Sequence, residues 1–248
     1  MIVREIYDYL DLIAPFDTAE EWDNCGLTVG SFNKDVKKIY IALDVTSDAL
    51  NDAIDFGADL VITHHPMIFN PVSQITEDSL VYKAVKSGMS FIASHTCLDK
   101  AADGVNTCLA NAVGIKNLKT SDNDEFLKLG EIESCSAGEF ARKIKSALGG
   151  AVSFTDSGKA IKTVALCSGS GGDLVAEAKR IGADAFLTGE AKHHEYLLSE
   201  ELGISMLVAG HFETENIVCK YLYKSLKDKF GDTIEIKVSD FKNPVNHI

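Results

Sequence analysis

The sequence lacks several features that mark membrane, secreted and fibrous proteins. No apolar run approaches the roughly 18–20 residues that a membrane helix needs, so no membrane span is predicted. The six cysteines are scattered among 248 residues without a Cys-x-x-Cys pair, which predicts neither a zinc finger nor a disulfide framework. The N-terminus, Met1 to Ile6, carries charge where a signal peptide needs an apolar stretch. We therefore expect a cytoplasmic protein with reduced thiols.

Basic residues are also scarce. Lys and Arg number 24 against 37 Asp and Glu, which gives a formal net charge of −13. Because an acidic body repels a phosphate backbone at long range, we do not expect nucleic acid as a partner. Hydrophobic residues make up 46% and charged residues 25%, which is ordinary globular composition and excludes a disordered or fibrous chain.

Helical and strand patterns alternate along most of the chain. Apolar residues at helical spacing predict a first helix over residues 2–13, and a capping box predicts another over residues 136–148. Strands that alternate with helices predict an α/β fold with mixed sheets flanked by helices. Buried strands are expected over residues 38–43, 59–63 and 90–94, and the alternation resumes at residue 162.

An internal repeat is the most informative feature. The segment Gly57-Ala-Asp-Leu-Val-Ile-Thr63 recurs as Gly182-Ala-Asp-Ala-Phe-Leu-Thr188, at an offset of 125 residues. The next strands also match, because Gly88–His95 resembles Gly203–His211 after one inserted residue. We therefore predict that the strand–helix–strand units near residues 39–65 and 164–190 are duplicates.

The duplication predicts two similar α/β halves, residues 1–115 and 116–248, which can intertwine. Two such halves would face each other across a shared cleft. Each half presents a histidine followed four residues later by a carboxylate, and the repeat puts these two pairs in equivalent positions. The pairs are His95…Asp99 and His211…Glu215.

His64 and His65 follow a buried strand, where ligands bind in open α/β sheets. Neutral imidazole is the commonest metal ligand in proteins, although a His-His pair alone is also an ordinary loop feature. Each His–carboxylate pair alone can likewise be a cap or a surface ion pair. Convergence of all three clusters would supply three nitrogens and two carboxylates, which exceeds one tetrahedral zinc and suits two divalent ions. This donor set accepts zinc, iron, manganese, cobalt or nickel. The candidate ligands are His64, His65, Asp99, His211 and Glu215.

Other candidates are less specific. Ser168–Gly172 joins a strand to a helix, and it predicts either a nest of amides for phosphate or a plain tight turn. Glu190, His193 and His194 lie beside the expected cleft, although Glu190 can equally stabilise the start of a helix. The loop of residues 22–24 either packs on the body, with its tryptophan buried, or lines the cleft with its polar residues.

A family resemblance rests on six sequence motifs, which occur in a specific order along nearly the whole chain. They are Glu21–Gly30, Thr63–Pro66, Ser94–Asp99, Cys167–Gly172, Thr188–Glu190 and Gly210–Glu215. In these motifs the chain resembles the short form of the Nif-three-like dinuclear metal-centre proteins, often named GTP cyclohydrolase 1 type 2 homologues. The resemblance implies two α/β halves, two metal ions in the cleft between them, and a toroidal homohexamer built as a trimer of dimers.

The resemblance also implies a role for each ligand. His64 and His211 would hold one metal, His65 and Asp99 the other, and Glu215 would bridge both. His95 matches the family's histidine beside the ligand Asp, which makes it a neighbour of the ligands or a substrate contact. The repeat alone, by contrast, would make His95 a ligand. A histidine beside the metals can shuttle a proton at neutral pH, and His95 is therefore the candidate catalytic residue.

The function that follows is metal-dependent hydrolysis of a nucleotide or another phosphorylated, anionic substrate. The family name points to a GTP cyclohydrolase type of reaction, and phosphoester hydrolysis suits the same ions. The alternative is a non-catalytic ring, stabilised by its metals, that binds or scaffolds a partner. Loss of turnover with retained partner binding in ligand variants would distinguish the enzyme from the scaffold.

Overall fold

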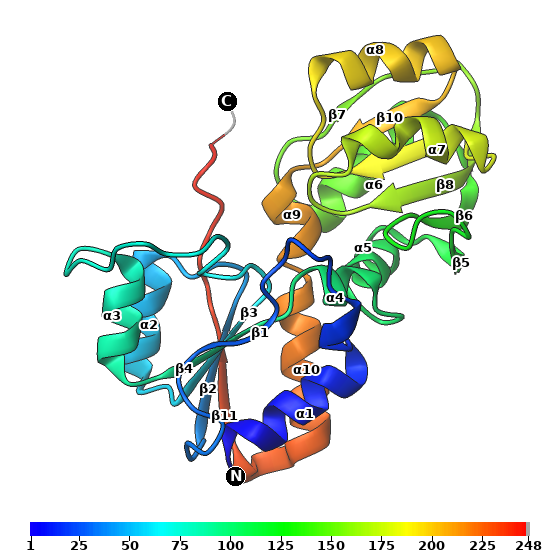
Figure 1. The fold of residues 1–248 in the computed structure, drawn as a ribbon. Helices are drawn as coiled ribbons and strands as arrows, with labels where there is room; N and C mark the ends of the chain where they lie inside the picture. The colour runs from blue at the N-terminus through cyan, green and yellow to red at the C-terminus, as the bar shows by residue number, and fades with distance from the viewer. Residues whose placement is uncertain (247–248) are drawn as a thin grey trace. The chain divides into compact units, whose positions relative to one another are not determined.

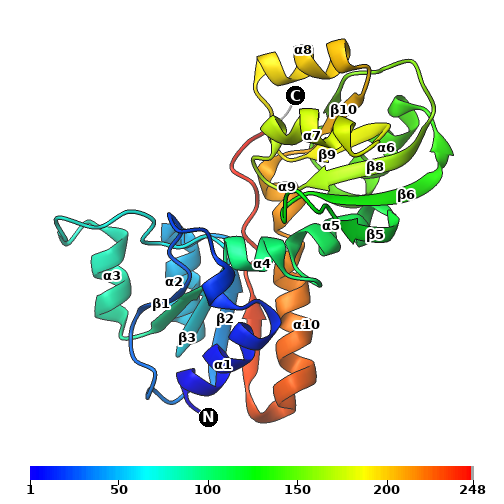
Figure 2. The same cartoon turned by 45° about the vertical axis from the view of Figure 1, so that its right-hand side comes forward.

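Two mixed sheets, each covered by helices, carry the fold in the computed structural model, which describes residues 1–246 (Figures 1 and 2). The described residues separate into two compact units. The first comprises residues 1–101 and 218–242, and the second comprises residues 102–217 with the segment from residue 243. The predicted α/β class with mixed sheets is confirmed. The predicted halves, which rest on the sequence repeat rather than on contacts, stay a prediction.

The first unit is built on a five-stranded sheet. Its strands are β1 (Gly26–Val29), β2 (Lys38–Ala42), β3 (Leu60–Thr63), β4 (Ser90–Ala93) and β11 (Glu235–Val238). Their order is β1-β4-β3-β2-β11, and all neighbours are parallel except β1 and β4. The helices are α1 (Val3–Ile13), α2 (Ser47–Phe56), α3 (Leu80–Ser87), α4 (Thr96–Lys100) and α10 (Val218–Phe230), with short 3-10 turns at Phe16–Thr18 and Gly231–Thr233. In Figures 1 and 2, α2 and α3 lie on one side of the sheet and α1 and α10 on the other.

The second unit is built on a six-stranded sheet. Its strands are β5 (Lys116–Thr120), β6 (Lys128–Cys135), β7 (Ser153–Phe154), β8 (Ile161–Cys167), β9 (Ala185–Thr188) and β10 (Ser205–Val208). Their order is β5-β6-β8-β9-β10-β7, with β8, β9 and β10 parallel and the outer pairings antiparallel. The helices are α5 (Val105–Val113), α6 (Ala137–Leu148), α7 (Val175–Arg180), α8 (His193–Leu202) and α9 (His211–Glu215), with a 3-10 turn at Gly172–Leu174.

Each of the two sheets is buried on both faces. Successive side chains of a strand point alternately to the two faces, and helices cover each face. In the second unit, Val164 and Leu166 pack with α5 and α6, whereas Ala165 and Phe186 pack with α7 and α8. In the first unit, Tyr40 and its neighbours pack with α2 and α3 in the same way. None of the helices within residues 1–246 is long and apolar enough to cross a membrane.

The predicted repeat is confirmed by the strand register. Ile39 pairs with Leu60 in the first unit, and Val164 pairs with Ala185 in the second, so both partners are displaced by the same 125 residues. The helix before each inner strand ends at a glycine with positive φ, Gly57 at 75° and Gly182 at 88°. Only glycine adopts this conformation without strain, which explains why both copies begin with the same residue.

The aspartates of the two Gly-Ala-Asp segments have matching roles. The Asp59 carboxylate accepts hydrogen bonds from the amides of residues 37–38 at 2.8 and 3.0 Å. The Asp184 carboxylate accepts the amides of residues 162–163 at 3.0 and 2.9 Å. Each aspartate therefore fixes the start of the neighbouring strand, and this sets where the opposite, ligand-bearing ends of the strands lie.

Candidate metal centre

Three histidines gather at the carboxyl ends of β3 and β4 in the first unit. His64 and His65 directly follow β3, and His95 lies two residues after β4. One nitrogen of each ring lies within 4.8 Å of the others. Because β3 and β4 are parallel neighbours, their carboxyl ends meet at one edge of the sheet. The topology therefore brings together residues that are about thirty positions apart in the chain.

An oxygen acceptor holds the Nδ1 atom of each histidine predicted as a ligand and of His95. The contacts are His64 to the Ser94 carbonyl at 2.9 Å, His65 to Asp44 at 2.7 Å, His95 to Asp23 at 2.9 Å, and His211 to Glu190 at 3.1 Å. In neutral rings of His64, His65 and His95 these contacts place the proton on Nδ1 and the lone pair on Nε2, whereas both nitrogens of His211 face carboxylates. A carboxylate or carbonyl on the distal nitrogen is the usual support of a metal-ligating histidine. The side chains therefore fit a divalent metal in donor type and in tautomer.

Asp99 completes the donor set of the first unit. Its Oδ1 lies 3.5 Å from Nε2 of His64, and both side chains are largely buried. The equivalence predicted for the two His–carboxylate pairs is thus only partial, because Asp99 approaches His64 rather than His95. The reason is that His95 precedes α4 as its N-cap residue, whereas His211 is inside the first turn of α9. Only a residue inside the helix shares a face with the residue four positions later.

The Asp23 carboxylate is buried. From the sequence alone, its loop could either pack on the body or line a cleft. It accepts hydrogen bonds from His95 Nδ1, from the Thr96 amide and hydroxyl at 3.0 and 2.5 Å, and from Cys25 Sγ at 3.1 Å. Burial raises the pKa of Asp23, but the hydrogen bonds from His95, Thr96 and Cys25 outweigh burial and hold the pKa far below its usual range. The carboxylate is therefore ionised, and it fixes the orientation of the His95 ring.

His211 and Glu215 form the donor pair of the second unit. His211 opens α9, and its Nε2 lies 2.9 Å from Oε2 of the buried Glu215, as the predicted spacing on one helix face requires. Glu190, one of the less specific sequence candidates, contacts the Nδ1 atom of the same ring. Burial lowers the pKa of His211, but the hydrogen bonds and charges of Glu215 and then Glu190 outweigh it and raise the pKa to about 9.

The Gly-rich loop packs against Glu215. A Cβ added to Gly169 would lie 2.1 Å from Oε1 of Glu215, and Gly169 has a φ of +60°. Three amides of the loop are donated to side chains: Ser168 to Asn106, Gly169 to Thr214, and Gly171 to Thr188. These contacts favour the tight turn over the phosphate nest, because three of the five loop amides are already donated to side chains.

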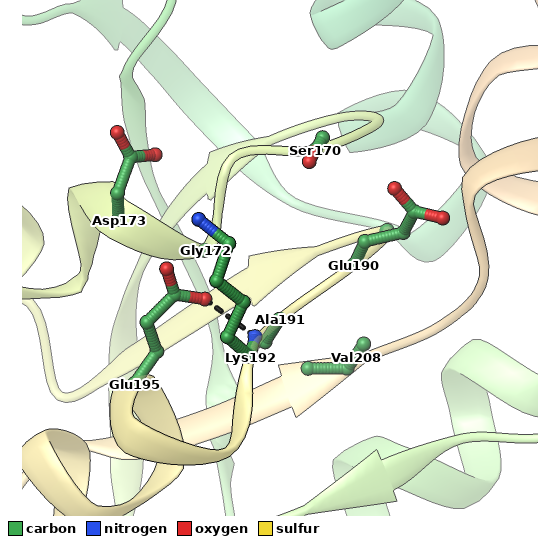
Figure 3. Close-up of a pocket in the computed structure, with 9 residues that line it drawn as sticks. Ser170, Gly172, Asp173, Glu190, Ala191, Lys192, Glu195 and Val208 are labelled. Carbon is green, nitrogen blue, oxygen red and sulfur yellow. Dashed lines mark hydrogen bonds between the residues drawn. The ribbon is translucent and has the colours of Figure 1, made fainter.

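A pocket of about 520 Å³ in the second unit lies beside this loop (Figure 3). Its charged lining comprises Asp173, Glu190, Lys192 and Glu195, so carboxylates predominate and an anion is not favoured there. Glu195 uses one oxygen to accept the Lys192 amide at 2.6 Å. His193 and His194 are exposed on α8, and neither belongs to a cluster of metal-ligand side chains found within residues 1–246.

Replacing Gly169 by Ala should displace the Glu215 carboxylate and weaken metal binding. A non-glycine residue at this φ costs about 1–3 kcal/mol, and the added methyl also meets Oε1 of Glu215. Gly182→Ala is the matched control, because Gly182 has a φ of +88° and nothing within 4 Å of an added Cβ. The unfolding temperature should fall for both variants. Elemental analysis should show loss of metal for Gly169→Ala alone. Equal metal content in both variants would contradict the steric argument.

Comparison with known proteins finds relatives that cover the whole length of the chain. The profile of the family described as Duf34/NIF3 (NGG1p interacting factor 3) matches residues 1–244. The chain belongs to the Duf34/NIF3 family. This confirms the resemblance that the sequence motifs carry.

Among family members, a Clostridium perfringens protein named GTP cyclohydrolase 1 type 2 homolog is 31% identical, with all of both chains covered. A Helicobacter pylori protein named GTP cyclohydrolase 1 type 2 is 30% identical over 100% of this chain and 99% of that protein. The crystal structure of Staphylococcus aureus protein SA1388 matches with a TM-score of 0.90 and 26% identity, covering 100% of this chain and 99% of that one. The family and the donor groups together support a metal-binding protein.

Proposed function

We propose that the protein is a metal-dependent hydrolase that binds two divalent ions and acts on a nucleotide or another phosphorylated, anionic substrate. The observation that carries the proposal is the common support of four histidines, each held at Nδ1 by an oxygen acceptor. Histidines used only for packing would not need an oxygen acceptor at the same ring nitrogen in all four cases. Supported imidazoles next to buried carboxylates are the pattern of a metal centre.

The ligands are the five residues that the sequence predicts: His64, His65, Asp99, His211 and Glu215. They provide three neutral nitrogens and two negative charges, so two divalent cations would leave a surplus of positive charge that suits an anionic substrate. Bound ions would lower the pKa of water and stabilise negative charge that develops on the substrate. As the sequence resemblance implies, we include a homohexameric ring, a trimer of dimers, in the proposal.

His95 supplies proton transfer in this proposal. Its Nδ1 is held by the ionised Asp23, and its ring centroid lies 5.1 Å from His64 and 5.3 Å from His65. A carboxylate on Nδ1 fixes the tautomer, so Nε2 can accept a proton from attacking water and later donate it to the leaving group. The resemblance makes His95 a neighbour of the ligands or a substrate contact, and these contacts support a proton-carrying role for it.

The name GTP cyclohydrolase 1 type 2, borne by the Helicobacter pylori relative, makes GTP the first substrate to test. Purified protein should be assayed with GTP, other nucleotides and simple phosphoesters, before and after chelation. We expect hydrolysis that disappears on chelation, returns with metal, and is lost in His64→Ala. His193→Ala is the control, because His193 is exposed on α8. A protein that retains its metals but turns over none of these substrates would favour the scaffold.

Metal binding at His211 and Glu215 should release a proton at neutral pH. The metal-free His211 has a pKa of about 9 and is protonated at pH 7, so the ion must displace a proton. Below that pKa the apparent affinity should fall about tenfold per pH unit through this residue. Titration calorimetry in buffers with different ionisation enthalpies measures the protons released. Glu190→Gln removes one of the charges that raise the pKa, and it should reduce the release. Release of the same number of protons at pH 7 and well above pH 9 would contradict the raised pKa of His211.

A further inference from the structure

Two aromatic side chains lie at the surface next to His95. Trp22 is 57% exposed and Phe69 is 44% exposed. Their ring centroids are 5.7 Å apart with planes tilted by 44°, and they lie 6.1 and 6.2 Å from the His95 ring. The alternative in which the loop of residues 22–24 packs with a buried Trp22 is therefore wrong. A large indole left in water beside candidate catalytic groups requires a different explanation.

The backbone around the two rings is tied down. Asp23, next to Trp22 in the chain, is anchored to His95 and Thr96 by the hydrogen bonds described above. The Asn24 side chain donates a hydrogen bond of 2.6 Å to the carbonyl of Ile68, the residue before Phe69. One short loop is thus fastened to both the His95 segment and the Phe69 segment. The backbone that carries both rings is thus held before any ligand arrives, which reduces the entropy cost of binding.

We propose that Trp22 and Phe69 form a stacking site for a planar heteroaromatic ring of the substrate. A base that stacks on an aromatic side chain gains affinity of about 5- to 150-fold, and every base can do so because each has a π-face. The inference names the substrate class of the hydrolase, and in this respect it rests on the proposed function. The His95 ring contacts both aromatic rings and also the rings of His64 and His65. A ring stacked on the aromatic pair would therefore be separated from these two candidate ligands by His95.

The chain provides its own probe, because Trp22 is the only tryptophan in the sequence. The metal-loaded protein should be titrated with GMP and with ribose 5-phosphate, which carries a phosphate but no base. We expect GMP to quench the emission of Trp22 saturably and ribose 5-phosphate to bind about 5- to 150-fold more weakly. Free tryptophan amide titrated in parallel corrects for absorption by the base.

Phe69→Leu tests the second ring while leaving the probe in place. It should weaken GMP binding by about 5- to 150-fold. Phe154→Leu is the matched control, since Phe154 is also 44% exposed but lies in β7 of the second unit. That variant should bind GMP as the wild type does. Equal binding of GMP and ribose 5-phosphate, or unchanged GMP affinity in Phe69→Leu, would overturn the proposal.

Three further outcomes separate this inference from the proposed function and from a different use of the rings. Quenching by GMP without turnover of any substrate supports the stacking site and rejects the hydrolase. Turnover of ring-free phosphoesters that Phe69→Leu does not affect, together with no quenching by GMP, rejects the stacking site and leaves the hydrolase. A blue shift of Trp22 emission that follows protein concentration rather than ligand would show the rings buried against another copy, and would also reject it.

Discussion

Replacing His95 by Gln is expected to lower kcat by about 10²–10⁴ while the metal content stays at the wild-type level. The reason is the arrangement of the His95 ring between the ionised Asp23 on Nδ1 and the His64 and His65 rings. Glutamine keeps a polar side chain of similar reach, but it cannot carry a proton at neutral pH. Steady-state kinetics and elemental analysis of the same preparation measure both quantities.

The competing role for His95 is support of the metal site. One of its nitrogens lies within 4.8 Å of those of His64 and His65, so the ring is close enough to act as a ligand or to orient one. Loss of such a supporting contact lowers metal affinity by roughly 10–100-fold. A His95→Gln variant that loses metal and regains full activity in excess metal would exclude the proton-transfer role. His193→Gln, an exposed change on α8, should alter neither quantity.

The sequence predicted those parts of the fold and site that depend on local patterns. The Gly-Ala-Asp repeat predicted the duplicated strand–helix–strand unit, because each of its residues acts within that unit: the glycine ends a helix and the aspartate binds the neighbouring strand's amides. The spacing of His211 and Glu215 predicted their contact for the same reason, since one turn of helix joins them. The short helices α4 and α9, of five residues each, are too brief for periodicity to indicate.

The carboxylates that orient the histidines were harder to predict, because tertiary structure brings them into place. Asp23 is 72 residues from His95 in the sequence, and no pattern connects the loop before β1 with the start of α4. Asp44 and Glu190 did carry a signal. Each lies 21 residues before the histidine that it contacts, just after the parallel strand that neighbours the histidine's own strand. Polar residues at successive strand ends meet at one edge of a parallel sheet, and this rule could have assigned both.

Replacing Glu215 by Gln should remove more metal than any other single change to the ligand set. The family resemblance implies that Glu215 bridges both ions, and a neutral amide bridges two cations poorly. The loss should exceed the roughly 100-fold change in affinity that removal of a supporting contact produces, because Glu215 is a direct ligand in the proposal. His64→Ala should empty mainly one position. Elemental analysis per chain, after dialysis against buffer without metal, distinguishes the two variants.

The structure adds a second reason for a large effect at Glu215. The carboxylate is buried, and Gly169 leaves just enough room for its Oε1, so a glutamine amide would bring N–H groups into a space shaped for an oxygen. Glu213→Gln is the matched control on the same helix, where the Glu213 carboxylate accepts a hydrogen bond from Asn243 at 2.9 Å. That variant should keep the wild-type metal content. Two metals per chain in Glu215→Gln, undiminished by dialysis, would disprove the bridging role and would leave Glu215 only as the partner that raises the pKa of His211.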